Sequence, residues 1–237
     1  VARIALDGTT TLHKVAKLFV FEGLSRSEAA NAEAGEIVAM TGVEYVSISD
    51  TIATADRPEA LPGIDIGQPT VQMTFGVNTS PFAGRDGQYV NSRQLRERLS
   101  AELQTNVGLR VEDTESAEVF LVSGRGELHL AILIETMRRE GHEFQVSKPE
   151  AIVKIADGQK QEPYELLVLD VGEESVGLLI ENLSSRLARM TDMRGDSQGR
   201  VRLEFEIPTR GFIGFRSFFL KATRGNGEMN SIFTAYE

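Results

Sequence analysis

Two similar turns stand in separate halves of this chain, SGRG at residues 123–126 and PTRG at residues 208–211. A run of apolar or alternating residues precedes each turn, at 119–122 and at 201–207, and indicates a strand that leads into it. After each turn apolar side chains recur at helical spacing. Each turn therefore predicts a strand followed directly by a helix.

Four further elements surround the first turn. Residues 70–77 alternate strictly, which predicts a strand with one buried face. Ser92 then precedes leucines that recur every four residues, and this predicts a helix capped by Ser92. The short apolar runs at 109–111 and 144–146 predict two more strands. The predicted order over residues 68–150 is β-α-β-β-α-β.

The segments around the second turn repeat that order. Residues 166–171 form an apolar run, and Ser175 begins a segment with one apolar helical face. Glycines 195 and 199 bracket a hairpin, and residues 231–233 predict a last strand. The sequence thus predicts two split-βαβ, ferredoxin-like units in tandem, the second over residues 151–237.

The first 67 residues have a different pattern. They contain short apolar runs at 18–21 and 36–40, with glycines between them, which predicts strands rather than helices. Residues 58–63 have the proline and glycine content of a linker.

Composition excludes several classes of protein. The chain has 237 residues and no cysteine, so disulfides, thiolate zinc sites and cysteine nucleophiles are excluded. No apolar run approaches the ~18 residues of a membrane helix. The formal net charge of −10 argues against a generic nucleic-acid binder.

The charge is nevertheless uneven. Residues 186–224 hold nine basic and four acidic side chains, a net charge of +5 in an acidic chain. This stretch is the first candidate for contact with a phosphate backbone. The predicted RNA-contacting residues are Arg194, Arg200, Arg210, Arg216, Lys221 and Arg224.

Catalytic motifs are missing from the sequence. A phosphate-binding P-loop needs a Gly-Lys pair, and the chain has none; it also lacks the Asn-Lys-x-Asp motif that reads guanine. We therefore predict no catalytic and no nucleotide-binding residues in this chain. The three histidines do not have metal-ligand spacing, so no metal site is predicted either.

One turn has a weaker functional interpretation. Gly124, Arg125 and Gly126 follow a strand and open a helix, so their amides are a candidate anion site. The alternative is a tight structural turn in which Glu127 complements the helix dipole, and this alternative is favoured.

Five longer motifs together resemble the BipA/TypA family of bacterial translational GTPases. They are QPTV at 68–71, NTSPFAGRDG at 78–87, LRVEDT at 109–114, SGRGELHL at 123–130 and PTRGFIGFR at 208–216. The GELHL part is shared with elongation factor G and LepA, whereas SPFAG and RGFIGFR point to BipA/TypA in particular. The resemblance covers nearly the whole chain.

The resemblance implies a multidomain β and α+β protein. Its parts are a partial translation-factor β-barrel over 1–67, the family's third domain over 68–150, and its fifth, elongation-factor-G-like domain over 151–237. We expect the barrel to be incomplete, because 67 residues are few for six strands. The family's GTPase domain and its C-terminal domain are expected to lie outside this chain.

The family also implies a function. The intact protein is expected to bind the ribosome, through rRNA and ribosomal proteins, and to hydrolyse GTP in the bacterial cytoplasm. It is expected to act in translation, ribosome assembly and stress adaptation. GTP and magnesium are expected only in the GTPase domain, and this chain is expected to be a docking part without cofactor or membrane contact.

Two rival functions remain open at this point. The first is a free-standing ligand-binding or regulatory protein, because ferredoxin-like units often bind small ligands. The second is a small acyl-phosphate hydrolase, which would need a phosphate-binding turn. Co-purification with ribosomal particles separates these alternatives from the docking function.

Overall fold

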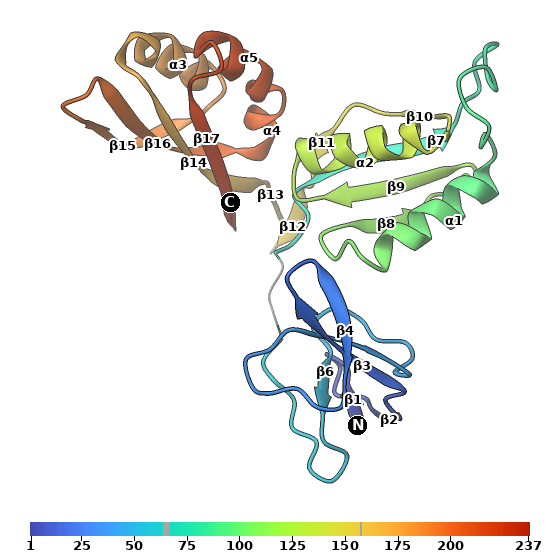
Figure 1. Ribbon diagram of the computed structural model, residues 1–237. Coiled ribbons are helices and arrows are strands. Elements are labelled where there is room, and N and C mark those ends of the chain that lie inside the picture. The colour runs from blue at the N-terminus through green and yellow to red at the C-terminus, as the bar shows by residue number, and fades with distance from the viewer. Residues whose placement is uncertain (64–66, 157) are drawn as a thin grey trace. The chain divides into compact units, whose positions relative to one another are not determined.

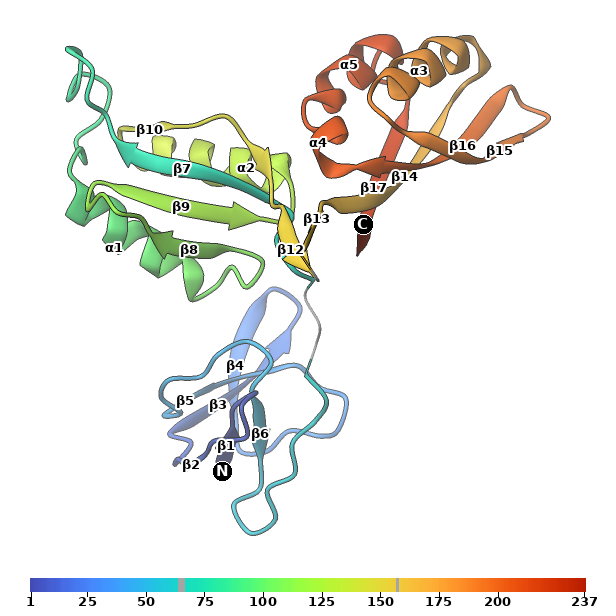
Figure 2. The same cartoon turned by 180° about the vertical axis from the view of Figure 1, so that it is seen from behind.

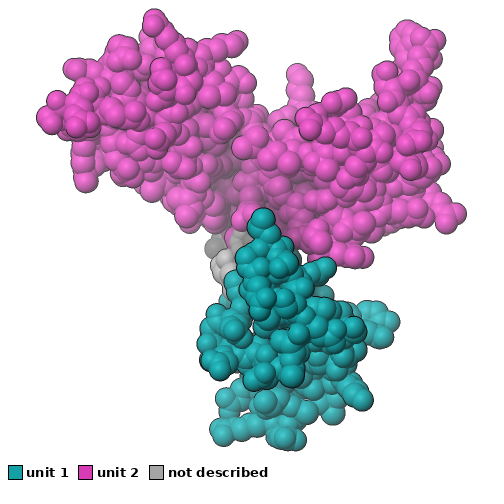
Figure 3. Space-filling view, viewed as in Figure 1, with its two compact units in different colours: residues 1–66 teal, residues 67–237 magenta. Residues whose placement is uncertain are grey.

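The structure, a computed structural model, describes residues 1–63, 67–156 and 158–237. The chain divides into two compact units, residues 1–66 and 67–237, which Figure 3 shows in two colours. Each unit is described by itself.

The first unit consists of two three-stranded antiparallel sheets (Figure 1). In one sheet β1 (Ala2–Ile4) lies between β2 (Thr10–Leu12) and β6 (Thr51–Ala53). In the other, β3 (Lys17–Glu22) lies between β4 (Ser25–Ala29) and β5 (Val38–Thr41). No strand pair of the described residues joins the two sheets.

The core of this unit is small. Among the described residues of the unit, only Ala2 and Ile4 count as buried apolar residues. Several large apolar side chains are exposed instead: Leu6, Leu12, Leu24, Ile37, Tyr45 and Leu61. An ion pair of 2.6 Å between Arg3 Nε and Asp50 Oδ2 ties β1 to the turn before β6.

The second unit begins with a module of four main strands and two helices. The elements follow as β7 (Val71–Val77), α1 (Ser92–Leu103), β8 (Arg110–Asp113), β9 (Val119–Gly124), α2 (Glu127–Arg139) and β10 (Phe144–Val146). This is the order predicted from the sequence. The sheet order is β10-β7-β9-β8, with antiparallel pairing throughout, and β11 (Glu150–Ala151) also pairs with β7. We call this the first module.

One core explains why both helices lie on the same face of that sheet. Alternate residues of β7, which point to one face, pack in a single apolar cluster with α1 and α2. The helix start differs by one residue from the prediction. Asn91, not Ser92, is the N-cap: its side chain accepts from the amide of Gln94, and the Gln94 side chain completes the capping box.

A hairpin, β12 (Lys154–Ala156) and β13 (Gln159–Gln161), leads to the second module. Its elements are β14 (Pro163–Gly172), α3 (Glu173–Ser185), β15 (Arg189–Gly195), β16 (Arg200–Pro208), α4 (Thr209–Phe212), α5 (Phe215–Ala222) and β17 (Glu228–Tyr236). The sheet order is β15-β16-β14-β17, again antiparallel (Figure 2). In both modules the order across the sheet is therefore fourth, first, third and second strand.

The helix predicted after residue 211 is broken into two. Ile213 and Gly214 separate α4 from α5, and Gly214 has a positive φ of 76°. Phe215 and Phe219 of α5 are buried in the core of the second module, and Phe212 and Phe218 pack against it. These four phenylalanines therefore belong to the core of the second module.

Candidate nucleic-acid interface and the pocket between the modules

The predicted basic residues of the β15–β16 hairpin are partly neutralised. Arg194 Nε lies 2.6 Å from Asp192 Oδ2, and the Arg200 guanidinium donates to the carbonyl oxygen of Asp170 at 3.2 Å. Both arginines line a surface hollow that also contains Asp196 and Glu228. The electrostatic field around this hairpin is therefore mixed in sign.

Arg210 on α4 is paired as well. Its Nε lies 2.6 Å from Glu162 Oε2, although the Arg210 side chain is half exposed. A surface pair of this kind is worth little in stability, but it leaves the guanidinium less available to a phosphate.

The remaining three predicted residues lie on α5 or directly after it. Arg216, Lys221 and Arg224 are exposed on α5 and just after it, and no carboxylate of the described chain forms an ion pair with them. Arg216, near the start of α5, also lines the pocket between the modules, whereas Lys221 lies near its end and Arg224 follows its C-cap. The inward side of α5 carries Phe215 and Phe219. Leu220, 45% exposed, lies among them. We call this surface, Arg216, Leu220, Lys221 and Arg224, the α5 ridge.

Glu204 and Glu206, two carboxylates of the same module, are paired with other arginines than Arg216. Glu204 Oε1 lies 3.3 Å from Arg202 Nε, and Glu206 is paired with Arg189. Strand β16 points these carboxylates to the sheet face opposite the helices, because its buried residues alternate with them. Arg216, Lys221 and Arg224 thus belong to α5 or follow it directly, whereas Arg194 and Arg200 belong to the hairpin of β15 and β16 (Figures 1 and 2).

The turn at Gly124, Arg125 and Gly126 is closed by internal contacts. The amide of Arg125 donates to His129 Nδ1 at 3.3 Å, and the amide of Thr70 donates to the Gly124 carbonyl oxygen at 3.0 Å. A Cβ on Gly124 would lie 2.9 Å from Leu130, so close packing of strand on helix requires glycine here. Together with the Glu127 carboxylate in the first helical turn, these contacts favour the structural interpretation of the turn.

His129 belongs to the same structural network. Its Nε2 lies 3.0 Å from Asn106 Oδ1, whose amide nitrogen donates to Glu102 Oε1 at 2.9 Å. Since Nδ1 accepts from Arg125, the ring fits the neutral tautomer with hydrogen on Nε2. Burial, assisted by the Arg125 charge, lowers the pKa of His129 below its ordinary value.

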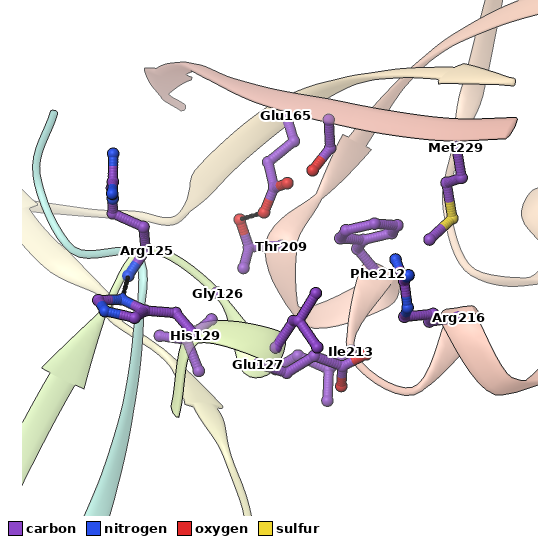
Figure 4. A pocket seen from close by; sticks show the side chains of 13 residues that line it. Arg125, Gly126, Glu127, His129, Glu165, Thr209, Phe212, Ile213, Arg216 and Met229 are labelled. Carbon is purple, nitrogen blue, oxygen red and sulfur yellow. Dashed lines mark hydrogen bonds between the residues drawn. The ribbon is translucent and has the colours of Figure 1, made fainter. Parts of the chain in front are cut away.

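A pocket of about 210 Å³ lies between the two modules of the second unit (Figure 4). The first module contributes Val71 and residues 125–129. The second contributes side chains from β14, α4 and β17, together with Ile213 and, from α5, Arg216. Glu165 is a buried polar residue among those that line it. Its Oε1 accepts from Thr209 Oγ1 at 2.9 Å, and burial raises the pKa of this carboxyl despite hydrogen bonds from Ser231 and Thr209.

The α4–α5 break holds the two modules together. The Gly214 amide donates to Glu127 Oε2 at 2.7 Å, and Ile213 packs against the apolar core of the first module. Arg186 fixes this segment from the other side, because its Nη1 donates to the carbonyl oxygens of Gly211 and Ile213 at 2.9 and 3.1 Å. We call Glu127, Ile213, Gly214 and Arg186 the inter-module latch.

Sequence reasoning missed Glu165 and the latch. One signal was available for Glu165, because it occupies an inward position of a strand whose other inward residues, Leu167, Leu169 and Val171, are apolar. No comparable signal exists for Glu127 and Gly214, since a contact across 87 positions depends on how two modules pack.

The described residues contain no group of three or more His, Cys, Asp or Glu side chains placed to hold a metal ion. In residues 1–63, 67–156 and 158–237 no helix has the length and apolar character needed to cross a membrane.

Comparisons with known proteins place this geometry in context. Residues 159–237 match the family model of the elongation factor G C-terminus. The chain is 56% identical over 235 residues to the large ribosomal subunit assembly factor BipA of Synechocystis, an alignment that covers 99% of this chain and 39% of that protein. The Bacillus subtilis protein of the same name is 49% identical over 237 residues, with 100% and 39% covered.

The corresponding protein of Escherichia coli K12 is 51% identical over 231 residues, which cover 98% of this chain and 38% of that protein. The chain thus spans about two fifths of the length of these curated relatives. A crystal structure from Thermus thermophilus resembles the whole chain with a TM-score of 0.57 and 16% identity, over 50% of that chain. This last likeness concerns the fold alone.

Proposed function

The chain belongs to the BipA family, and on that premise we propose that it is the non-catalytic, ribosome-docking part of a longer translational GTPase. The name of its relatives, large ribosomal subunit assembly factor, supports a ribosomal particle as partner, met through rRNA and ribosomal proteins. The intact protein would act in translation, ribosome assembly and stress adaptation in the bacterial cytoplasm.

We assign three domains within this part. The two sheets of residues 1–67 represent a partial translation-factor β-barrel, open because no described strand pair closes it. Residues 68–150 and 151–237 represent two ferredoxin-like units, which their shared strand order supports. The match of residues 159–237 to the elongation factor G C-terminus supports assigning the last unit as the fifth domain.

Nucleotide chemistry is assigned to the GTPase domain of the intact protein, where GTP and magnesium would bind. The sequence has no Gly-Lys pair for a P-loop, and the one glycine-rich strand-to-helix turn is occupied by its own contacts with His129 and Thr70. We therefore predict that this chain binds neither GTP nor GDP at micromolar concentrations. Calorimetry with both nucleotides checks this.

The observation that carries the docking function is the α5 ridge. Three cations without an ion-pair partner in the described chain lie on or directly after one short helix, on a chain whose net charge is −10. Such a surface attracts a phosphate backbone locally, while the acidic remainder repels RNA elsewhere. We therefore rank Arg216, Lys221 and Arg224 above Arg194 and Arg210, which are ion-paired, and above Arg200, which donates to a backbone carbonyl oxygen and lies in a hollow with acidic neighbours.

The test is binding of the 237-residue chain to purified large ribosomal subunits at about 50 and 200 mM salt. In the variant Arg216→Ala/Lys221→Ala/Arg224→Ala, the slope of log affinity against log salt should fall by about 2–3, close to 0.9 for each lost phosphate contact. The control is Arg138→Ala/Arg189→Ala/Arg202→Ala, which removes the same charge from arginines that are ion-paired.

The control should change the slope far less than the ridge variant does. If both variants weaken binding equally, only net charge matters and the ridge is not the interface. If the unaltered chain does not bind ribosomal subunits at all, the docking function itself is wrong.

A further inference from the structure

A long loop leaves the first module between β7 and α1. Residues 78–90 carry the NTSPFAGRDG motif, and they project beyond the sheet as the blue-green excursion seen in Figures 1 and 2. The space-filling view shows the same protrusion at the upper right (Figure 3). Neither the latch nor the α5 ridge uses this loop.

One carboxylate fixes the shape of the loop. Glu143, just before β10, accepts four hydrogen bonds from it: from Asn78 Nδ2 at 2.7 Å and from the amides of Gly84, Asp86 and Gly87 at 2.9, 2.9 and 3.1 Å. These hydrogen bonds hold the pKa of Glu143 below its ordinary value, so the carboxylate stays ionised at neutral pH. A loop closed around one anion in this way is preorganised.

The base of the loop is packed against the same segment. A Cβ on Gly87 would lie 2.7 Å from the Gly141 carbonyl oxygen, and the amides of Gln88 and Tyr89 both donate to that oxygen. The Tyr89 ring also contacts the His142 ring, with 4.8 Å between centroids. The loop therefore presents its tip from a fixed base.

The tip displays an aromatic ring and a cation together. Phe82 is 60% exposed, and the Arg85 guanidinium lies 4.8 Å from the centre of its ring. No carboxylate of the described chain forms an ion pair with Arg85. The neighbours Pro81, Ala83 and Gly84 are small, so the ring is open to solvent.

We propose that the tip of this loop is a second RNA contact, in which Phe82 stacks on an unpaired nucleobase and Arg85 meets the adjoining phosphate. The proposal rests on the docking function above and specifies a further part of its interface. Stacking of bases on exposed aromatic rings, supported by arginine, is the usual way in which proteins hold single-stranded RNA.

The surroundings of the ring favour RNA over a protein partner. Aromatic anchors of protein interfaces fill desolvated pockets and are ringed by other apolar contacts. Phe82 instead stands on a loop of small and polar exposed residues, among them Ser80 and Asp86, with a cation against its ring that forms no ion pair in the described chain. A flat base with a phosphate beside it matches this pair in shape and charge.

The chain itself permits a direct test, because it contains no tryptophan. Phe82→Trp makes the loop tip the single indole in the protein, and a stacked base quenches indole fluorescence. The probe is a short single-stranded oligoadenylate at low salt. The matched control is Phe21→Trp, because Phe21 is exposed to a similar extent, 51%, but lies on β3 in the first unit.

We expect oligoadenylate to quench Phe82→Trp in a saturable manner and to leave Phe21→Trp unchanged. Equal quenching of both indoles, or none at the loop, overturns the proposal. The outcome is independent of ribosome binding, so a chain that fails to bind subunits but shows selective quenching refutes the docking function and not the loop contact.

Binding to large ribosomal subunits gives the second measurement. Phe82→Ala should weaken binding about tenfold, in line with the loss of one stacked base. Arg85→Ala should reduce the salt slope by about 0.7, the value for one phosphate contact on a single strand. If the unaltered chain binds and both variants bind equally well with the same slope, the loop is not part of the interface.

Glu143→Gln separates stacking from loop geometry. The glutamine side chain has the same size but lacks the negative charge to which the three backbone amides of the loop donate. In the proposal Glu143 is therefore a positioning residue for Phe82. We expect the same loss of subunit binding as in Phe82→Ala, with no further loss when the two changes are combined. Additive losses would show that Glu143 does not act through the loop tip.

Discussion

Glu165 lines the pocket between the modules and also affects the stability of the fold. The carboxyl lies on the apolar face of β14, where burial raises its pKa, and only Thr209 and Ser231 hydrogen bond to it among the described side chains. A raised pKa in the folded state means that this group contributes stability below its unfolded pKa. That contribution is lost as pH rises through the folded pKa. Above the folded pKa, burial of the charged carboxylate therefore opposes folding.

We predict that Glu165→Gln stabilises the second unit at pH 7. The amide still accepts from Thr209 and carries no charge to bury. The gain in free energy of unfolding should shrink as pH falls toward about 4.3, the ordinary pKa of glutamate. Denaturant unfolding at pH 7 and pH 5 checks this, with the exposed Glu112→Gln as control. A variant less stable than the parent at pH 7 would contradict the argument.

For His129 the expected dependence of stability on pH has the opposite sign. Its pKa in the folded state is lowered, so its contribution to stability is present above the unfolded value of about 6.5 and is lost as pH falls through the folded pKa. We predict that His129→Asn costs about 1–2 kcal/mol at pH 7.5, through loss of the hydrogen bonds to Arg125 and Asn106.

The loss of unfolding free energy in His129→Asn should diminish toward pH 5.5. At that pH the unfolded parent protein binds a proton at His129, which already lowers the parent's own free energy of unfolding. His142 also has a pKa lowered by burial, and His142→Asn tests whether the pH dependence belongs to His129. A loss of stability that stays constant from pH 7.5 to 5.5 would show that His129 is not the source of the pH dependence.

At the scale of elements, the sequence predicted what local patterns determine. Period-two alternation found β7 and β16, and helical spacing found α1, α2 and α3, because one face of each element is buried in a single core. Boundaries were less well predicted. The strand predicted at 231–233 extends over Glu228–Tyr236, since pairing with β14 lengthens it beyond its apolar part.

Local sequence patterns could not predict the break between α4 and α5. Residues 209–222 have a continuous apolar periodicity, yet Ile213 leaves the helical path to pack against the first module, and Gly214 takes a positive φ. The loop around Glu143 is a similar case, because four donors from residues 78–87 converge on an acceptor 56 or more positions away. Contacts of this range depend on the assembled fold.

The latch gives a prediction at this scale. Ile213→Ala should lower the free energy of unfolding of the second unit by about 1–2 kcal/mol, less than the roughly 2–5 kcal/mol of a fully buried isoleucine. The matched control is Ile232→Ala, at a side chain that is 65% exposed. Thermal unfolding should also become less cooperative in Ile213→Ala, because the modules lose their shared apolar contact. Equal effects of the two changes would show that Ile213 does not join the modules.

At the scale of the whole molecule, the two units differ in how much apolar surface they bury. The second unit has two clusters of buried apolar residues, one in each module, whereas the described part of the first unit buries only Ala2 and Ile4. Because apolar burial is the main favourable term in folding, the first unit should open more readily.

Amide hydrogen exchange checks that difference. We expect amides of β3 and β5 to exchange much faster than those of β14 and β16, which form the centre of the second module. The charge asymmetry belongs to the same scale, because in the proposed docking an acidic chain with a basic ridge is expected to approach RNA in one orientation. Similar protection in both units would contradict the difference in core size.

The central claim is that the α5 ridge faces ribosomal RNA, and directed hydroxyl-radical probing tests it most directly. The chain has no cysteine, so Leu220→Cys carries an iron chelate at one known position, and Ser100→Cys on the exposed side of α1 serves as control. With the chain bound to large ribosomal subunits, iron at position 220 should cleave a small set of neighbouring rRNA nucleotides that iron at position 100 does not cleave. Binding without any cleavage specific to position 220 would contradict the account.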